Sequence, residues 1–328
     1  MKVLADILSA TIVFAIPLLL VALGGMFSER SGIVNIALEG IMVVGALFSC
    51  LLLRALDASG FGATHPQTGA LLAILTAAVS GALFSLLLAF ASVHLKADQT
   101  IGGTALNMLA PALAITVTWA IQGQGQTTIL IPTWVRITQA NFGLEVKETF
   151  LQNFLFKSLY LTTPVAILLL IIAIVVLYKT RFGLRLRSCG EHPQAADSVG
   201  INVYRMRYAG VFISGFLGGI GGLAYTVAAG SGFQSAVAGY GFLALAVMIF
   251  GNWKPWNILG ASLFFALFKI IGSYSGSIPF LPSFTNIKSS EYIYLMLPYI
   301  VTMIVLVLTS KKSRAPKAEG IPYDKGQR

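Results

Sequence analysis

Charged residues are scarce in this chain of 328 residues, where they make up 10% of the sequence. A soluble domain usually carries about 25%. Hydrophobic residues account for 56%, and the mean hydropathy is +0.82. The apolar runs are long and continuous, whereas β-barrel strands alternate over about ten residues. The composition therefore excludes a water-soluble protein and predicts an all-α, polytopic helical membrane protein.

Residues and motifs for covalent or metal chemistry are also few. The two cysteines, Cys50 and Cys189, provide neither a disulfide framework nor a metal cluster. His65, His94 and His192 all lie near loops or the ends of apolar runs. The phosphate-binding pattern G-x-x-x-x-G-K-[ST] is absent from the sequence. We therefore expect no enzyme, no catalytic residue, and no metal or cofactor site on this chain.

Apolar runs close to the ~20 residues that cross a bilayer predict about eight to ten transmembrane segments, including broken or short helices. The runs are 7–27, 33–56, 70–93, 101–121, 156–178, 208–229, 240–252, 257–275 and 291–309.

The link at 122–152 is long for a membrane protein, and such loops are often functional. We expect it to face outside and to form a docking surface for a delivery protein. The alternative is a surface hairpin or an interfacial helix with no special role.

Positive charge is concentrated in two segments, 179–207 and 311–328, which hold 12 of the 22 lysines and arginines. Positive charge beside membrane spans marks cytoplasmic segments, so topology rather than nucleic-acid binding explains the net charge of +10. We expect one permease domain over 1–310, with a cytoplasmic loop at 179–207, and a basic cytoplasmic tail at 311–328. Five runs precede the loop, which places the N-terminus outside unless one run is re-entrant or 122–152 contains a partial helix.

The basic loop contains the signature of a short helix. Pro193 fits the first helical position and Gly200 the position just past the end. Ala195, Ala196 and Val199 would then share a small apolar face. Such a short helix is unstable alone in water, so it must pack on the spans or on a partner. The alternative is an ordinary interfacial turn.

A polar, glycine-containing break at 27–32 interrupts the apolar pattern, which restarts at Ile33. Broken helices of this kind line solute paths in transporters. Asn35 and Glu39 are four residues apart, so a helix from Ile33 would place both on one face, and we take them as candidates for the substrate path. For Glu39 the alternatives are a structural pairing, with Arg30 or neighbouring backbone, and a place in a subunit interface.

Further polar and small residues occur within the apolar runs. Asn107 is a third candidate for the substrate path, and the alternative is a hydrogen bond between helices. Gly215 with Gly219, and Gly218 with Gly222, form two small-x-x-x-small pairs that allow close contact between helices.

Four segments together resemble a known transporter family. GEHPQAADSVGINVYRMRYAGVFISGFLGGIGGLAYTV is similar to the coupling region of ABC-importer permeases of the ribose/branched-chain amino acid superfamily. FSERSGIVNIALEGIMVVGAL, LKADQTIGGTALNMLA and GYGFLALAVMIFGNWKPWNILGASLF resemble its nucleoside-type subgroup in order and spacing. The resemblance covers about 14–308. One departure is His192, where the family pattern has Asn; His is a weaker helix cap.

The resemblance implies a coupling helix at about 191–200 that inserts into a groove on a cytoplasmic ATP-binding subunit. ATP and Mg²⁺ would be bound by that partner. The residues implied in coupling are Glu191, Pro193, Ala195, Ala196, Asp197, Val199 and Gly200. A second permease subunit, expected to be a different chain, and an extracytoplasmic substrate-binding protein would complete the importer.

The implied function is ATP-driven import of nucleosides by alternating access across a bacterial cytoplasmic (inner) membrane. Riboflavin or a simple sugar is the alternative solute. A different class is an ion-driven secondary transporter with Glu39 as its proton site. The basic loop argues against that class, because a symporter needs no contact with a motor.

Overall fold

The computed structural model describes residues 2–137, 159–273, 296, 299–300, 303–304, 307 and 315–326. Its helices are α1 (Lys2–Arg30), α2 (Leu38–Ala58), α3 (Phe61–Thr64), α4 (Pro66–Val93), α5 (Gln99–Gln122), α7 (Thr162–Lys179), α8 (Arg181–Glu191), α9 (Pro193–Ser198), α10 (Val203–Ala229), α11 (Tyr240–Phe250) and α12 (Pro255–Ser273). A 3₁₀ turn, Thr133–Val135, precedes strand β1 (Arg136–Ile137), which pairs antiparallel with β2 (Leu159–Tyr160).

Seven of these helices, α1, α2, α4, α5, α7, α10 and α12, are long and apolar enough to cross a membrane. Helix α11 is apolar but short. These elements confirm the prediction of a polytopic helical membrane protein with a short helix. The predicted run at 291–309 lies mostly outside the described residues.

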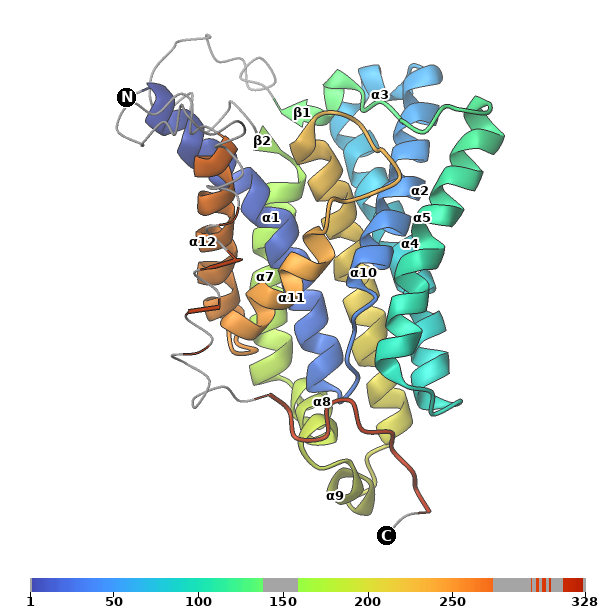
Figure 1. Ribbon diagram of the computed structural model, residues 1–328, viewed down its shortest axis with the longest axis vertical. Helices are drawn as coiled ribbons and strands as arrows, with labels where there is room; N and C mark the ends of the chain where they lie inside the picture. The colour runs from blue at the N-terminus through green and yellow to red at the C-terminus, as the bar shows by residue number, and fades with distance from the viewer. Residues whose placement is uncertain are drawn as a thin grey trace.

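The long helices stand roughly side by side, and the chain begins at the end of the bundle opposite α8 and α9 (Figure 1). The described C-terminal residues lie at the same end as α8 and α9. Five spanning helices precede α8, namely α1, α2, α4, α5 and α7. An odd number of crossings places the start of the chain at the end of the bundle opposite the basic loop. If the basic loop is cytoplasmic, as its charge predicts, this arrangement corresponds to the topology with the N-terminus outside.

Helix α10 lies at the centre of the bundle and packs closely on its neighbours because of its glycines. A Cβ atom at Gly219 would collide with the carbonyl oxygen of Ala77 in α4, and one at Gly215 would collide with Ser85. A Cβ at Gly222 would collide with the backbone of α2, and one at Gly218 would lie 2.9 Å from a methyl group of α2. The two glycine pairs thus face two different helices, α4 and α2.

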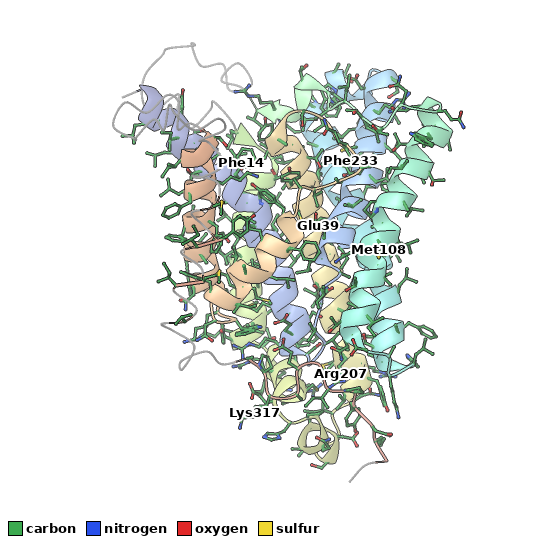
Figure 2. The ribbon with its side chains drawn as sticks, in the orientation of Figure 1. Phe14, Glu39, Met108, Arg207, Phe233 and Lys317 are labelled. Carbon is green, nitrogen blue, oxygen red and sulfur yellow. The ribbon has the colours of Figure 1, made fainter. Side chains whose placement is uncertain are left out.

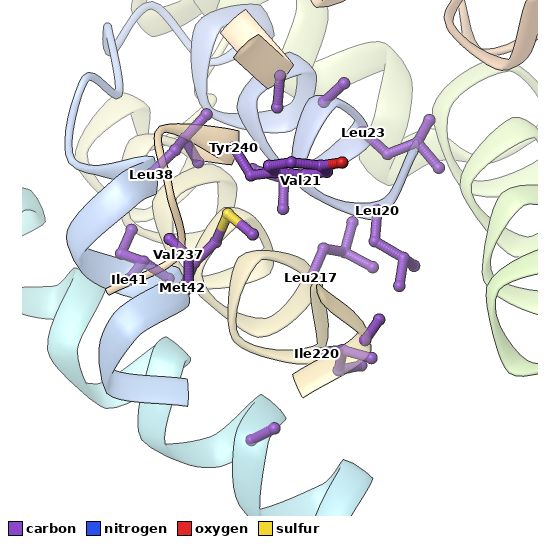
Figure 3. Packing of buried hydrophobic residues seen from close by; sticks show 14 of the residues in the cluster. Leu20, Val21, Leu23, Leu38, Ile41, Met42, Leu217, Ile220, Val237 and Tyr240 are labelled. Atoms are coloured by element: carbon purple, nitrogen blue, oxygen red, sulfur yellow. The ribbon is translucent and has the colours of Figure 1, made fainter. Parts of the chain in front are cut away.

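The core is formed where α1, α2, α10 and α11 meet, and Figure 3 shows its packing from close by. Its labelled members are Leu20, Val21, Leu23, Leu38, Ile41, Met42, Leu217, Ile220, Val237 and Tyr240. Helices α5 and α7 are far less covered by the rest of the protein. In their most apolar 18-residue stretches, 22% of the residues of α5 and 28% of those of α7 are buried. Their apolar side chains are therefore available to lipid or to another subunit.

Candidate translocation and coupling sites

Two helices, α2 and α11, begin inside the bundle rather than at its ends. Residues 31–37, which connect α1 to α2, are not helical, and α2 begins at Leu38. The expectation that helix resumes at Ile33 is therefore wrong. Gly32 adopts a positive φ of 96°, and the amide of Val34 donates to Oε1 of Gln99 at 2.7 Å instead of to a helical carbonyl.

Asn35 consequently lies in the break and does not share a helical face with Glu39. Its Nδ2 donates to Oγ of Ser214 in α10 at 2.8 Å, and the side chain is fully buried. Asn107 in α5 holds the other end of the break. Its Oδ1 accepts from the amide of Gly40 at 2.8 Å, and its Nδ2 donates to the carbonyl oxygen of Ile36 at 2.8 Å.

Glu39 lies in the first turn of α2 and also caps the start of α11. Its carboxylate oxygens accept from the amides of Gly239 at 2.8 Å and Gly241 at 2.6 Å. Arg30 is not its partner: it lies 3.9 Å from Glu191 and donates to the carbonyl oxygen of Trp253 at 3.1 Å. Of the readings of Glu39, the geometry favours pairing with backbone.

The position of Glu39 is chemically distinctive. It lies about half-way along the bundle (Figure 2) and is partly exposed. The N-terminal ends of α2 and α11 both meet there, and helix N-termini carry partial positive charge that a carboxylate stabilises. In secondary transporters, helices that begin within the membrane direct their N-terminal amides at anionic groups of the substrate.

The contacts of the break involve polar residues that the sequence did not single out, Gln99 and Ser214. The signal that could have identified Ser214 is a polar side chain within an apolar run. Gln99 directly follows Asp98, whose carboxylate caps α5 by accepting from the amides of Thr100 and Ile101, at 2.8 and 2.9 Å. From its sequence position, Gln99 is the first residue of a capped helix, and nothing in the sequence indicates that its side chain contacts the break.

The basic loop folds into two helices rather than one. Thr180 caps α8 by accepting from the amide of Gly183 at 3.2 Å. This helix was missed in the sequence, although Phe182 and Leu186, spaced four residues apart among arginines, are typical of an amphipathic helix. Both α8 and α9 project from one end of the bundle (Figure 1).

Helix α9 occupies the position expected for a coupling helix. Pro193 is at its first turn, and Gly200, with φ of 83°, follows its end. His192 precedes it but makes no capping hydrogen bond with its side chain. This agrees with the weaker capping expected of His at this position.

The predicted apolar face of α9 is divided by the fold. Ala196 is buried, at 3% exposure, against Cys189 and Val203. Ala195 is exposed, and Val199 is 74% exposed. The expectation that the three share one face is therefore wrong, because α9 ends at Ser198 and Val199 lies past its end, exposed to solvent.

The remaining coupling candidates are acidic residues at the ends of α8 and α9. Glu191 lies 3.9 Å from Arg30, and Asp197 lies 3.9 Å from Lys325. Lys325 belongs to the C-terminal segment, of which residues 315–326 are described. This segment packs against α8 and α9.

At the opposite end of the bundle, the described part of the 122–152 link borders a cavity of about 700 Å³. Polar residues from several elements line it, including Arg54, Asp57, Gln122 and Gln126. Nε1 of Trp134 donates to Asp57 at 2.8 Å and so fastens the link to α2. Residues 138–152 of the predicted docking surface lie outside the described residues.

Metal chemistry has no obvious place within the part of the chain that the structure describes. Among those residues, no three or more His, Cys, Asp or Glu side chains are close enough to hold a metal ion.

The chain is similar over its whole length to known permeases. It is 42% identical over 328 residues to the guanosine ABC transporter permease protein NupQ of Bacillus subtilis, covering 100% of this chain and 99% of the relative. It is 44% identical over 323 residues to the nucleoside ABC transporter permease protein NupC of Lactococcus lactis, covering 98% and 97%. A putative glucose ABC transporter permease protein of Haloferax volcanii, TsgC13, is 27% identical over 326 residues, covering 93% and 92%.

No solved structure matches the chain significantly. The family model for the permease component of branched-chain amino acid transport systems matches residues 7–307. The family match and the seven apolar helices together identify the chain as a multi-pass protein of the bacterial cytoplasmic membrane. The chain belongs to the family of branched-chain amino acid transport system permease components, and it is a permease subunit of an ABC transporter.

Proposed function

We propose that this chain is a permease subunit of an ATP-driven importer of nucleosides. The observation that carries the proposal is the identity of 42% and 44%, over nearly the whole chain, to permeases named for guanosine and nucleoside transport. A sugar is the second candidate solute, because a more distant relative is named as a putative glucose permease.

The cytoplasmic partner in this proposal is a separate subunit that binds ATP with Mg²⁺ and hydrolyses it. The exposed side of α9 would contact it, with Ala195 and Val199 outermost. Glu191 and Asp197 would act differently, since both form ion pairs within the chain. Ala196 would support the helix from beneath.

Two other partners complete the proposed importer. An extracytoplasmic substrate-binding protein would dock at the end that carries the cavity beside Arg54 and Asp57. A second permease, expected to be a different chain, would pair with this one, and solute would pass between the two by alternating access. The break at 31–37 and the start of α11 would line this path, with Glu39 holding the two together.

The test is uptake by a reconstituted complex. This chain would be placed in liposomes with the ATPase and permease encoded beside it, with and without the binding protein. Labelled guanosine, riboflavin, ribose and glucose would be compared. ATP-dependent uptake of guanosine is the expected result, and uptake of riboflavin or a sugar alone would replace the nucleoside as solute.

The contact through α9 is tested in the same liposomes. Val199→Asp places a charge on the exposed side of the helix and should reduce both ATPase binding and uptake. Ala196→Asp, which buries a charge, serves as the comparison and should reduce the amount of folded protein. Proton-driven uptake by this chain alone, without ATP, would contradict the importer.

A further inference from the structure

The described C-terminal residues 315–326, called the C-terminal strap below, lie across the end of the bundle that carries α8 and α9 (Figure 1). The strap forms backbone hydrogen bonds with two separate elements. The amide of Ala318 donates to the carbonyl oxygen of Gly190 in α8 at 2.8 Å. The amide of Gly320 donates to the carbonyl oxygen of Gly32, in the break after α1, at 3.3 Å. One short segment thus joins α8 to the break.

A buried arginine ties α10 to the same place. Arg207 is 1% exposed, and its Nη2 donates to the carbonyl oxygen of Ile321 in the strap at 3.0 Å. Its guanidinium lies 6.0 Å from the ring centre of Tyr323, and a Cβ at Gly32 would come within 3.0 Å of Nη2. A buried guanidinium needs polar partners, and the strap supplies one of them.

The far part of the strap holds the underside of α9. Tyr323 is 4% exposed and packs in one cluster with Ala196, Cys189 and Val203. Lys325 lies 3.9 Å from Asp197 of α9. The side of α9 opposite its exposed face is therefore covered by the strap.

A further contact fastens the strap to the turn between α4 and α5. Nζ of Lys96 donates to Oδ2 of Asp324 at 2.7 Å. Gln99, three residues further along, is the side chain that binds the amide of Val34 in the break. The turn therefore contacts the strap, and the first residue of α5, which follows the turn, contacts the break.

The near part of the strap reaches the last turn of α1. The carboxyl groups of Glu319 and Glu29 lie beside each other there. Nε1 of Trp253 donates to Glu29, and Arg30 donates to the carbonyl oxygen of Trp253. The turn between α11 and α12 is thereby connected to the same cluster.

We infer that the C-terminal strap is a mechanical link that passes movement of α9 to the break between α1 and α2. The inference rests on the proposed function, in which α9 contacts the ATPase and the break lines the solute path. A segment bonded to only one element could cover that element but could not pass its movement to another. The strap is bonded to α8, α9, α10 and the break, so α9 cannot shift without moving it or breaking these bonds. Tyr323 and Arg207 are positioning residues in this link.

The first experiment measures uptake and ATP hydrolysis together in the reconstituted complex. Tyr323→Ala should lower guanosine uptake per ATP hydrolysed by about tenfold, a typical size for coupling between sites. ATP hydrolysis and the amount of ATPase that copurifies should stay within about twofold of the parent. Tyr323→Phe keeps the ring and should restore most of the uptake. Lys317→Ala, which changes an exposed strap residue, is the matched control (Figure 2).

Two results would overturn the inference. Unchanged uptake per ATP in Tyr323→Ala would show that the strap carries no movement. Loss of ATPase binding together with uptake would make the strap part of the docking surface instead. If the parent complex takes up none of the solutes with ATP, the proposed function fails, and the strap is judged by the next measurement.

The second experiment needs no solute. Hydrogen exchange would be measured on the purified chain with and without residues 315–328. Removal of the strap should speed exchange both at 28–37 and at 190–203, because these segments are joined through it. Faster exchange at 190–203 alone, or no change, would contradict a link to the break.

Discussion

The carboxylate of Glu39, in the first turn of α2, accepts a hydrogen bond of 2.6 Å from the backbone amide of Gly241, in the first turn of α11. A second bond, from Gly239, uses the other oxygen of the same carboxylate. One side chain therefore satisfies amides at the start of a helix 200 residues further along the chain. Of the two glycines, Gly241 is buried, so its amide depends on this carboxylate for a partner.

Replacing Glu39 by Ala should destabilise the protein strongly. Each buried amide left without a partner costs about 1–3 kcal/mol. Glu39→Gln keeps one acceptor oxygen and should fall between Ala and the parent. The measurement is the unfolding temperature of the purified chain in detergent. Glu191→Ala removes a partly exposed ion pair worth about 0–1 kcal/mol and is the control. Equal decreases in unfolding temperature for Glu39→Ala and Glu191→Ala would show that the hydrogen bonds of Glu39 stabilise the protein no more than a partly exposed ion pair does.

Gly219→Ala should prevent normal packing of α10 on α4. The new methyl group would collide with backbone atoms of Ala77, which cannot move aside as a side chain can. Overpacking typically costs about 1–3 kcal/mol, and a backbone collision belongs at the upper end. Gly260→Ala is the control, since a Cβ there would meet nothing within 4 Å. The yield of monodisperse protein in detergent should fall for the first variant only.

Cys189 should react slowly with maleimide at neutral pH. Burial raises the pKa of its thiol to about 11, so only roughly one molecule in ten thousand carries the reactive thiolate at pH 7. Tyr323→Ala uncovers this cluster and should speed labelling, whereas Lys317→Ala should not. Mass spectrometry of the labelled peptide would separate Cys189 from the buried Cys50. Rapid labelling of Cys189 in the parent would show that Tyr323 does not cover this thiol.

Docking of the strap should weaken as the pH rises. Burial raises the pKa of Glu319 above its ordinary value of 4.5, although its hydrogen bond with Glu29 and the positive charge of Arg30 oppose the shift. The docked carboxyl then holds a proton that the free strap would release. Docking is therefore strongest below pH 4.5 and is lost as the pH climbs toward the raised pKa.

A fluorophore attached at Lys317→Cys would follow this change as the pH is raised from 4.5. Its emission should shift toward that of an exposed dye as the pH rises. Glu319→Gln mimics the protonated acid and should remove the dependence. A shift of equal size in that variant would assign the titration to another group.

The class of the protein could be predicted from sequence because run length and charge placement are local properties. Eight of the nine predicted runs correspond to described helices, and the predicted short run, 240–252, is the short helix α11. The helix at α9 was also predictable, since Pro193 and Gly200 act on their own backbone. Helix α8 was missed because its high arginine content dominated the pattern.

What the side chains contact was decided by tertiary structure alone. Asn35 and Glu39 are four residues apart, but the backbone leaves the helical path between them, so spacing placed them wrongly. Glu39 meets Gly241, and Arg207 meets Ile321, across separations of 202 and 114 residues. No local pattern encodes such pairs. They arise because packing brings distant segments together, and most buried polar groups then find partners among them.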